Sequence, residues 1–271
     1  TPQTDCVVEA RSVPGAGEHP VLKMPSRVMS IERAATDVIV LRMQLPANQN
    51  FQYRAGQYVD VMLSEGRRRS FSVASAPTDG PLLELHVRRA SSSGFTGQLF
   101  DSMRAGTLLR IEGPLGQFWF RNESRRPALM VGGGTGYAPL RAMLRQLLAT
   151  GDRRSVTLYW GGRTTADLYE DVWLTNVASV RSSFRYVPVL SESDSESFGA
   201  VRTGLVHDAV LEDFPDLSGH DVYASGPPAM IEAIRTAFPS HGLPRDQLFF
   251  DSFDYAPDTL ARMRAAARDK R

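Results

Sequence analysis

The tetrapeptide Arg69-Ser70-Phe71-Ser72 is the short segment of this chain whose side chains carry the most chemistry. Its guanidinium group suits a phosphate, its aromatic ring suits a flat ring system, and its hydroxyl groups suit a ring heteroatom. A flavin nucleotide presents these three features together. The same four residues are also compatible with an ordinary basic hairpin. The tetrapeptide therefore indicates a flavin site only if the segments that follow it agree.

Two glycine-containing turns follow later in the chain, each between a strand-like and a helix-like segment. The first reads GGGTG at residues 132–136, and the second reads SGPP at residues 225–228. Glycines in such turns let backbone N–H groups approach a pyrophosphate at a helix N-terminus, at the sheet edge where ligands bind. The first turn departs from the G-x-G-x-x-G pattern, because Tyr137 occupies the place of the last glycine. A dinucleotide site of a different design and a tight turn without a ligand are both open at this point.

The elements that must position these residues divide the chain into two regions. Residues 26–124 are rich in short β-like segments with one helix near 95–104, which predicts a small antiparallel β-barrel. Residues 125–255 alternate apolar strand-like runs with helix-like segments, which predicts a doubly wound parallel α/β sheet. The expected strands lie at 38–45, 58–63, 83–88 and 108–112, then at 128–131, 156–160, 184–190, 221–225 and 247–251. The helices of the second region are expected around 140–148 and near 167–178, 206–213 and 228–238.

The composition is that of an ordinary globular protein and excludes several classes of function. The chain has 271 residues, 42% of them hydrophobic and 23% charged, with a net charge of +1. A net charge this small gives no electrostatic argument for binding to nucleic acid or to a membrane surface. No apolar run approaches the roughly 20 residues of a membrane span. The single cysteine, Cys6, excludes an internal disulfide framework, and the five histidines show no metal-ligand spacing. We therefore expect a cytoplasmic protein with no metal, nucleic-acid or membrane partner.

Taken in order, the motifs resemble those of the ferredoxin–NADP⁺ reductase superfamily. The order is Arg-x-Phe/Tyr-Ser, then Gly-Gly-Gly-Thr-Gly, then Ser-Gly-Pro-Pro, then Asp-x-Phe at residues 251–253. The resemblance covers about residues 26–255. The segments ELHVR at 84–88, IEGPLG at 111–116 and YWGGR at 159–163 are similar to two groups within the superfamily. One comprises the reductase components of bacterial oxygenases and of the deoxysugar (CDP-glucoseen) system, and the other the NAD(P)H:flavin reductases.

The resemblance implies FAD as one cofactor and gives the tetrapeptide roles. Arg69 would pair with a flavin phosphate, and Ser70 would belong to the same site. Phe71 would pack on the isoalloxazine, where the family more often has Tyr, and Ser72 would hydrogen-bond flavin N5, the hydride acceptor. Two further segments would flank FAD, namely His86, Val87 and Arg88 at the ribose and pyrophosphate, and Phe95, Thr96 and Gly97 as a helix N-terminus at the pyrophosphate.

The resemblance implies NADH or NADPH as the second cofactor. Ser225 would lie near the path of the nicotinamide C4, where many members have Cys. Asp251 and Phe253 would be the carboxylate and the aromatic ring beside the flavin, although a turn cap and a core aromatic are the alternatives. With Ser72, these residues would form the catalytic set. The residues expected to cradle the dinucleotide are Gly133, Gly134, Thr135, Gly136, Gly226 and Pro227.

Arg163 leaves the nucleotide preference open. Its guanidinium could meet a 2′-phosphate and so favour NADPH, whereas the carboxylate of Asp167 nearby would repel that phosphate. We expect a slight preference for NADH.

The two ends of the chain are expected to lie outside these domains. Residues 1–25 are predicted to form a strand and a linker, and residues 256–271 a helical tail. The segments 6–11 and 23–28 resemble the tail and linker that join a plant-type 2Fe–2S ferredoxin domain to such a reductase. That domain needs four thiolates, and the chain has only Cys6. The resemblance therefore predicts that the ferredoxin domain is missing, through truncation or natural loss.

Residues and resemblance together predict a flavoprotein reductase. The expected reaction is hydride transfer from NAD(P)H to FAD, followed by release of single electrons to an iron–sulfur domain or protein that serves an oxygenase or a deoxygenation enzyme. Two alternatives stay open. One is a reductase that uses free flavin as a substrate, and the other is a non-catalytic regulatory module with the same fold.

Overall fold

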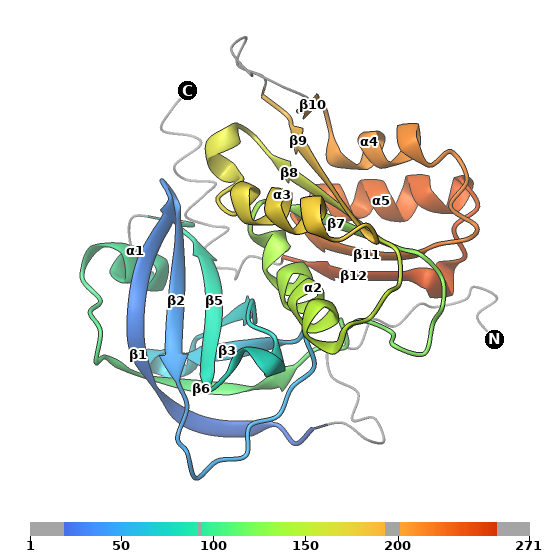
Figure 1. Ribbon diagram of the computed structural model, residues 1–271. Helices are drawn as coiled ribbons and strands as arrows, with labels where there is room; N and C mark the ends of the chain where they lie inside the picture. The colour runs from blue at the N-terminus through green and yellow to red at the C-terminus, as the bar shows by residue number, and fades with distance from the viewer. Residues whose placement is uncertain (1–18, 92–93, 193–200, 254–271) are drawn as a thin grey trace, which may run out of the picture.

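The computed structural model describes residues 19–91, 94–192 and 201–253, which form a β-barrel and an α/β domain packed against each other (Figure 1). The predicted helical tail at 256–271 and most of the predicted strand and linker at 1–25 lie outside these residues. Within the described part of the chain, no helix is long and apolar enough to cross a membrane.

The first domain is the antiparallel barrel that the sequence predicts. Its elements are β1 (Leu22–Ala35), β2 (Val38–Gln44), β3 (Tyr58–Met62), β4 (Arg68–Ser72), β5 (Leu82–Arg88), α1 (Gly94–Asp101) and β6 (Leu108–Leu115). The strands follow the order β4-β3-β6-β1-β2-β5. The sheet closes where Val73, directly after β4, bridges Leu85 of β5, and where the Ala74 N–H donates to the Glu84 carbonyl at 2.8 Å.

The barrel begins earlier than the sequence suggested. Strand β1 starts at Leu22 and pairs with β6 from its first residue, Leu22 opposite Gly113. The boundary expected between residues 25 and 26 therefore falls inside this strand. Pro25 obscured it, because proline is uncommon within a strand, but the burial of Met24 and Ser26 shows that the alternation runs through it.

The second domain is a parallel sheet covered by helices on both faces. Its elements are β7 (Ala128–Gly133), α2 (Tyr137–Thr150), β8 (Val156–Gly162), α3 (Asp171–Val180), β9 (Phe184–Leu190), β10 (Arg202–Thr203), α4 (Val206–Asp213), β11 (Asp221–Gly226), α5 (Pro228–Ser240) and β12 (Leu248–Ser252). The strand order is β10-β9-β8-β7-β11-β12, so the direction of winding reverses between β7 and β11. Ligands of open α/β folds bind at the carboxyl edge of such a switch point.

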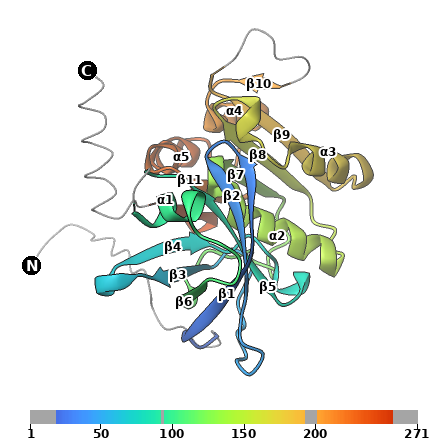
Figure 2. The same cartoon turned by 90° about the vertical axis from the view of Figure 1, so that its left-hand side faces the viewer.

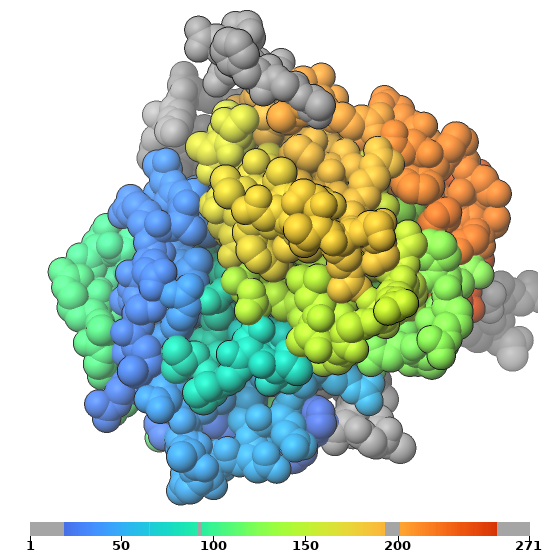
Figure 3. All heavy atoms as spheres, in the orientation of Figure 1, coloured from blue at the N-terminus to red at the C-terminus, as the bar shows by residue number. Residues whose placement is uncertain are grey.

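Two apolar cores lie on opposite faces of this sheet. One contains side chains of α2 and α3, such as Leu144 and Leu174, and the other contains side chains of α4 and α5, such as Val210 and Ile234. Figure 2 shows the two helix pairs on either side of the strands. The space-filling view shows α2 and α3, in lime and yellow, lying directly against the blue and teal surface of the barrel (Figure 3).

Short 3₁₀ turns connect several elements, and one of them changes a predicted boundary. The turns are η1 (Ser64–Gly66), η2 (Pro77–Asp79), η3 (Gly134–Gly136), η4 (Thr165–Asp167) and η5 (Arg245–Gln247). The helix expected from residue 167 begins at Asp171 instead, because η4 ends at Asp167, whose side chain caps its own turn. The two-residue strand β10 was not predicted, since it is too short to show a pattern.

The closed barrel predicts that substitutions at two residues of β6 change the free energy of unfolding by different amounts. Ile111 is fully buried in the barrel core, whereas Leu108 on the same strand is 65% exposed. We expect Ile111→Ala to lower the free energy of unfolding by about 2–5 kcal/mol, through lost burial and a cavity. Leu108→Ala should change it by less than about 0.5 kcal/mol. Chemical denaturation of both variants measures this, and equal losses would contradict the barrel.

Candidate functional site

The predicted flavin strand meets the predicted nucleotide turns at the carboxyl edge of the parallel sheet. Gly132, Ser225 and Asp251 are register neighbours on β7, β11 and β12. From the barrel, the hydroxyl group of Ser72 at the end of β4 donates to Asp251 Oδ2 at 3.1 Å. Residues that are far apart in sequence thus form one row at the switch point of the sheet, as a two-cofactor site requires.

The two glycine-containing turns are packed against each other so closely that side chains would not fit. A Cβ at Gly136 would lie 2.0 Å from the Ser225 carbonyl oxygen, and a Cβ at Gly133 would lie 2.8 Å from Met230 Sδ. A Cβ at Gly226 would lie 3.1 Å from the Gly133 nitrogen. The glycines therefore serve the contact between two turns, and an isolated tight turn would not need them all. This arrangement favours the dinucleotide-site interpretation.

Ser225 is the buried polar group at this edge that the protein leaves without a partner. The residue is fully buried, and its Oγ makes no hydrogen bond within the described residues. An unpaired buried hydroxyl group is costly, so such a group calls for an explanation. A ligand with a polar group at this edge, such as the nicotinamide carboxamide, would supply the missing hydrogen bond. Ser225 and the glycine cradle thus fit a bound dinucleotide.

The tetrapeptide divides between the two faces of β4. Arg69 and Phe71 lie opposite Val61 and Val59, which belong to the barrel core, so they share the inner face. The Phe71 ring lies 5.9 Å from that of Phe95, at the start of α1. Arg69 donates to the Arg68 carbonyl at 2.8 Å.

The two serines of the tetrapeptide share the other face of β4. Ser70 donates to Asp60 Oδ1 at 2.6 Å, within the barrel. Ser72, at the end of the strand, is the one whose side chain reaches the α/β domain. On the same side, the Phe253 N–H donates to the Gly226 carbonyl at 3.0 Å, which holds the segment after β12 beside the second turn.

The segment His86–Val87–Arg88 alternates between the two faces of β5. Strand alternation turns Val87 into the barrel core, where it is fully buried, and turns its two neighbours toward the α/β domain. His86 Nδ1 lies 2.9 Å from the Tyr169 hydroxyl oxygen, and its Nε2 lies 3.2 Å from Glu84 Oε1. Both ring nitrogens are thus engaged within the protein, and the place of His86 beside the FAD ribose stays a prediction.

Arg88 belongs to a cluster of four charges that crosses the domain boundary. Its Nη2 lies 3.2 Å from Asp167 Oδ1, and its Nε lies 3.4 Å from Asp37 Oδ2. The same two carboxylates lie near Arg163, at 3.4 Å for Asp167 and 3.7 Å for Asp37. The Arg88 guanidinium also lies against the glycine turn, since a Cβ at Gly134 would be 3.0 Å from its Nη1. Arg88 therefore contacts the nucleotide turn from the barrel side.

Asp167 is ionised and fixed in this cluster. Burial alone would raise its pKa, but the backbone N–H groups of Thr164 and Arg163 donate to it and lower the pKa below the usual range. The two hydrogen bonds measure 3.2 Å and 2.9 Å, respectively. A negative charge therefore stands in the turn between β8 and α3, near the strand end where an adenosine ribose lies in dinucleotide-binding folds.

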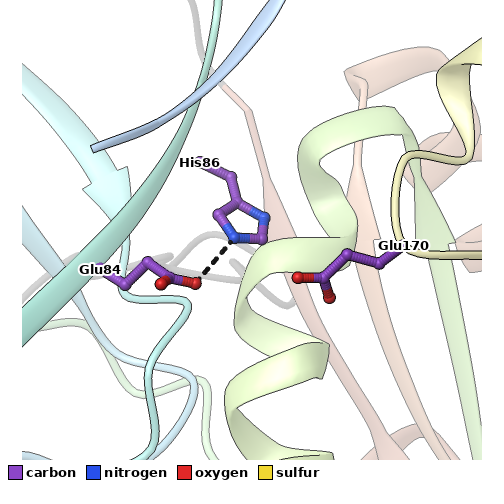
Figure 4. Close-up of side chains that lie close together, drawn as sticks. All are labelled: Glu84, His86 and Glu170. Atoms are coloured by element: carbon purple, nitrogen blue, oxygen red, sulfur yellow. Dashed lines mark hydrogen bonds and ion pairs between the residues drawn. The ribbon is translucent and has the colours of Figure 1, made fainter. Parts of the chain in front are cut away.

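The sequence did not point to a second, buried cluster between the domains. Glu84 and His86 of the barrel face Glu170 of the α/β domain, and one ligand atom from each lies within 4.8 Å of the others (Figure 4). The cation between the two carboxylates is the guanidinium of Arg141, 2.9 Å from Glu84 and 2.7 Å from Glu170. The alternation of side chains along β5 could have indicated Glu84 from the sequence. Nothing in the amphipathic pattern of α2 distinguishes Arg141 from the other residues of that helix.

The fold and the site define a class of protein. An antiparallel flavin barrel followed by a doubly wound nucleotide domain, with a serine of the barrel at the switch point, is the design of the ferredoxin reductase type. Residues 25–120 match the family of oxidoreductase FAD-binding domains, and residues 130–236 match the family of oxidoreductase NAD-binding domains. The chain belongs to the NAD(P)H-dependent flavoprotein reductases of the ferredoxin reductase type.

Known relatives include reductases of several systems. The CDP-6-deoxy-L-threo-D-glycero-4-hexulose-3-dehydrase reductase of Yersinia pseudotuberculosis is 42% identical over 84% of this chain and 68% of its own length. The reductase component of propane 2-monooxygenase from Gordonia is 31% identical over 88% of this chain and 69% of its length. The crystal structure of the Amycolatopsis reductase GcoB superposes with a TM-score of 0.79 at 34% identity, over 87% of this chain and 71% of that one. These findings confirm the predicted family and fold.

The contact between the two turns makes Gly136 intolerant of substitution. Gly136→Ala would place a methyl group 2.0 Å from the Ser225 carbonyl oxygen, so the turns must separate. We expect about a tenfold or greater loss of NAD(P)H affinity, since each 1.4 kcal/mol of lost packing is a factor of ten. The control is Gly219→Ala, because a Cβ at Gly219 has nothing within 4 Å. Fluorescence titration with NADH measures both, and unchanged affinity in Gly136→Ala would place the nucleotide elsewhere.

Proposed function

We propose that this protein takes hydride from NAD(P)H to FAD and passes single electrons to an iron–sulfur centre, which serves an oxygenase or a deoxygenation enzyme. The observation that carries the proposal is the hydrogen bond from Ser72 to Asp251 at the switch point. It supports the proposal, because it brings the end of Arg69–Ser72 to the sheet edge that carries the two glycine-containing turns. Hydride transfer needs two ring systems in contact, and this edge is where both binding motifs converge.

When bound, FAD and NAD(P)H would supply the redox chemistry, in which the nicotinamide is oxidised and the flavin is reduced by transfer of a hydride. The residues of the chain would bind and orient the two cofactors. Ser72 would hydrogen-bond flavin N5 through the hydroxyl group that now donates its proton to Asp251. Phe71 offers a ring face to the isoalloxazine, and Arg69 offers a cation to the phosphates. Phe253 lies beside the second turn, where it would border the flavin.

The electron acceptor is proposed from the relatives and from the cysteine count. The relatives include reductase components of oxygenases and of a hexulose dehydrase, as their names state. Within these 271 residues Cys6 is the single cysteine, so the four thiolates of a plant-type cluster must come from another polypeptide segment or protein. Reduction of a 2Fe–2S ferredoxin by the FAD-loaded protein and NADH tests this, and failure with several such ferredoxins would overturn it.

We further propose that NADH is preferred over NADPH. Arg163 is the residue that could bind a 2′-phosphate, but Asp167 and Asp37 lie beside its guanidinium. The ionised Asp167 would also repel a phosphate placed after β8. The charge cluster thus neutralises the cation that NADPH would need.

The flavin role of the tetrapeptide is testable with two variants. Arg69→Ala should lower FAD affinity by about tenfold or more, because a charge-assisted contact is lost. Ser72→Ala should retain FAD and slow its anaerobic reduction by NADH about tenfold, the scale of one hydrogen bond. Stopped-flow absorbance of the bound flavin measures both.

The control for these variants is Arg67→Ala, since Arg67 is exposed on the same hairpin and bonds to Ser64. It should retain FAD and its rate of reduction. Normal FAD binding and reduction in both test variants would move the flavin site elsewhere. A wild-type protein that binds no FAD and reduces only added flavin would replace the proposal with a free-flavin reductase.

The nucleotide preference is testable at Asp167 and Arg163. Asp167→Asn should lower the ratio of kcat/KM for NADH to that for NADPH by about tenfold, because about 1.4 kcal/mol of repulsion is removed. Arg163→Ala should leave the NADH preference in place. If wild type prefers NADPH and Arg163→Ala abolishes that preference, the assignment is reversed.

A further inference from the structure

One guanidinium group, that of Arg141 on α2, joins the flavin domain to the nucleotide domain. Its Nη1 lies 2.9 Å from Glu84 Oε1 and donates to the Ala74 carbonyl at 2.9 Å, both in the barrel. Its Nε donates to Glu170 in the α/β domain, at 2.7 Å to Oε2 and 3.0 Å to Oε1. Arg141 is only 8% exposed, so these contacts are made away from water.

On the nucleotide side, the contacts of Arg141 lead directly to the glycine turn. Glu170 also accepts a hydrogen bond of 2.7 Å from the hydroxyl group of Tyr137, the residue that follows Gly136. The Tyr137 ring stacks on that of Trp160 at 4.1 Å between centroids. Trp160 Nε1 in turn donates to the Gly134 carbonyl at 2.9 Å. The position of the turn is therefore tied to Arg141 through three side chains, those of Glu170, Tyr137 and Trp160.

On the flavin side, the contacts of Arg141 lead directly to the tetrapeptide. Ala74, whose carbonyl it holds, lies two residues after Ser72 in the same extended segment. Glu84 accepts the Ala74 N–H at its backbone carbonyl and donates its own N–H to Ser75 Oγ at 3.1 Å. Arg141 thus holds the end of the flavin strand in two ways. It binds the Ala74 carbonyl oxygen, and it binds Glu84, the residue that pairs with Ala74.

The charges of this cluster are balanced and held in place. Burial would raise the pKa of Glu84, but the hydrogen bond from His86 and the charge of Arg141 outweigh it and lower the pKa to about 2. Arg42 provides a second cation, with its Nε 2.7 Å from Glu84 Oε2. Two carboxylates thus face two guanidinium groups. The fork of an arginine suits this place, because it binds several acceptors in fixed directions.

We propose that Arg141 is a positioning residue for hydride transfer, which sets the separation and angle between the nucleotide turn and the flavin strand. The proposal rests on the function proposed above. Arg141 itself touches neither predicted cofactor site, so its loss should affect the geometry of transfer rather than the binding of either cofactor. A displacement of about 1 Å between reacting groups is enough to lower a rate about 100-fold.

The same helix offers a matched control, one turn further along. Arg145 also crosses the domain boundary, with its Nε 2.6 Å from Asp79 Oδ2. Its side chain is 33% exposed, and it contacts neither β4 nor the turn after β7 in the described residues. A partly exposed pair of this kind contributes little to stability or geometry. Arg145→Ala therefore removes an interdomain ion pair without touching the two motifs.

The first experiment measures anaerobic flavin reduction by NADH in the FAD-loaded wild type, Arg141→Ala, Arg141→Lys and Arg145→Ala. Arg141→Ala should lose about 100-fold in the limiting rate of reduction, with FAD content and half-saturating NADH concentration nearly unchanged. Arg141→Lys should lose about tenfold, because an ammonium group keeps the charge but not the fork. Arg145→Ala should react as wild type does.

Chemical rescue separates a positioning role from general damage. Millimolar guanidinium chloride should restore most of the rate of Arg141→Ala, since the ion fits between the two carboxylates that the variant leaves behind. Urea, which has the same shape without the charge, and sodium chloride should not restore it. Should Arg141→Ala fail to fold, Arg141→Lys carries the test by its limiting rate.

Hydrogen exchange of the flavin-free proteins gives a readout that is independent of activity. The Ala74 and Ser75 amides should exchange faster in Arg141→Ala than in wild type and Arg145→Ala. If NADH reduces the FAD of the wild-type protein normally, and Arg141→Ala and Arg141→Lys show the same limiting rate, the positioning role is overturned while the proposed function stands. If neither NADH nor NADPH reduces wild-type FAD, the proposed function fails and the positioning role fails with it.

Discussion

The interface between the two domains depends on charges that have been removed from water. Arg141 is buried between Glu84 and Glu170, and no apolar contact could replace the directions of its hydrogen bonds. Burying ions costs solvation energy, and a well-packed apolar interface of the same size is often as stable or more so. What a buried ion pair adds is a defined geometry, because breaking one contact leaves an unpaired charge. In an enzyme that must align two ring systems, a defined geometry between domains matters more than additional stability.

A second constraint acts at the sheet edge, where two turns share one small space. At Gly136 and Gly226, backbone of one turn occupies the volume that a side chain of the other would need, and at Gly133 the side chains of Met230 and Pro227 occupy it. Ser225 is buried at this contact, and its hydroxyl group has no hydrogen-bond partner among the described residues. The parallel register then places Asp251 on the adjacent strand, about 4.8 Å away in the hydrogen-bonding direction. The reach of Ser72 across the domain boundary follows from this order of strands.

The sequence predicted the elements whose patterns are local and missed those that depend on distant partners. Strand β9, at Phe184–Leu190, agrees with its predicted range, because a segment rich in aromatic and β-branched residues is typical of a strand. The long strand β1 was not among the predicted strands, and its first residues were assigned to the N-terminal segment that ends at Pro25. The start of α3 was placed too early, because a capped 3₁₀ turn precedes it. Arg141 could not have been identified, since the Ala74 carbonyl that it holds lies 67 residues away in the chain.

Strand β5 shows how local alternation bears on what a family resemblance assigns. The resemblance placed His86, Val87 and Arg88 beside the FAD ribose and pyrophosphate, and consecutive residues of a strand point to opposite faces. Val87 therefore enters the barrel core, while His86 and Arg88 project toward the other domain. Their partners there, Tyr169 and Asp167, both lie in the segment between β8 and α3. Strand β5 is thus an edge along which the barrel contacts the α/β domain.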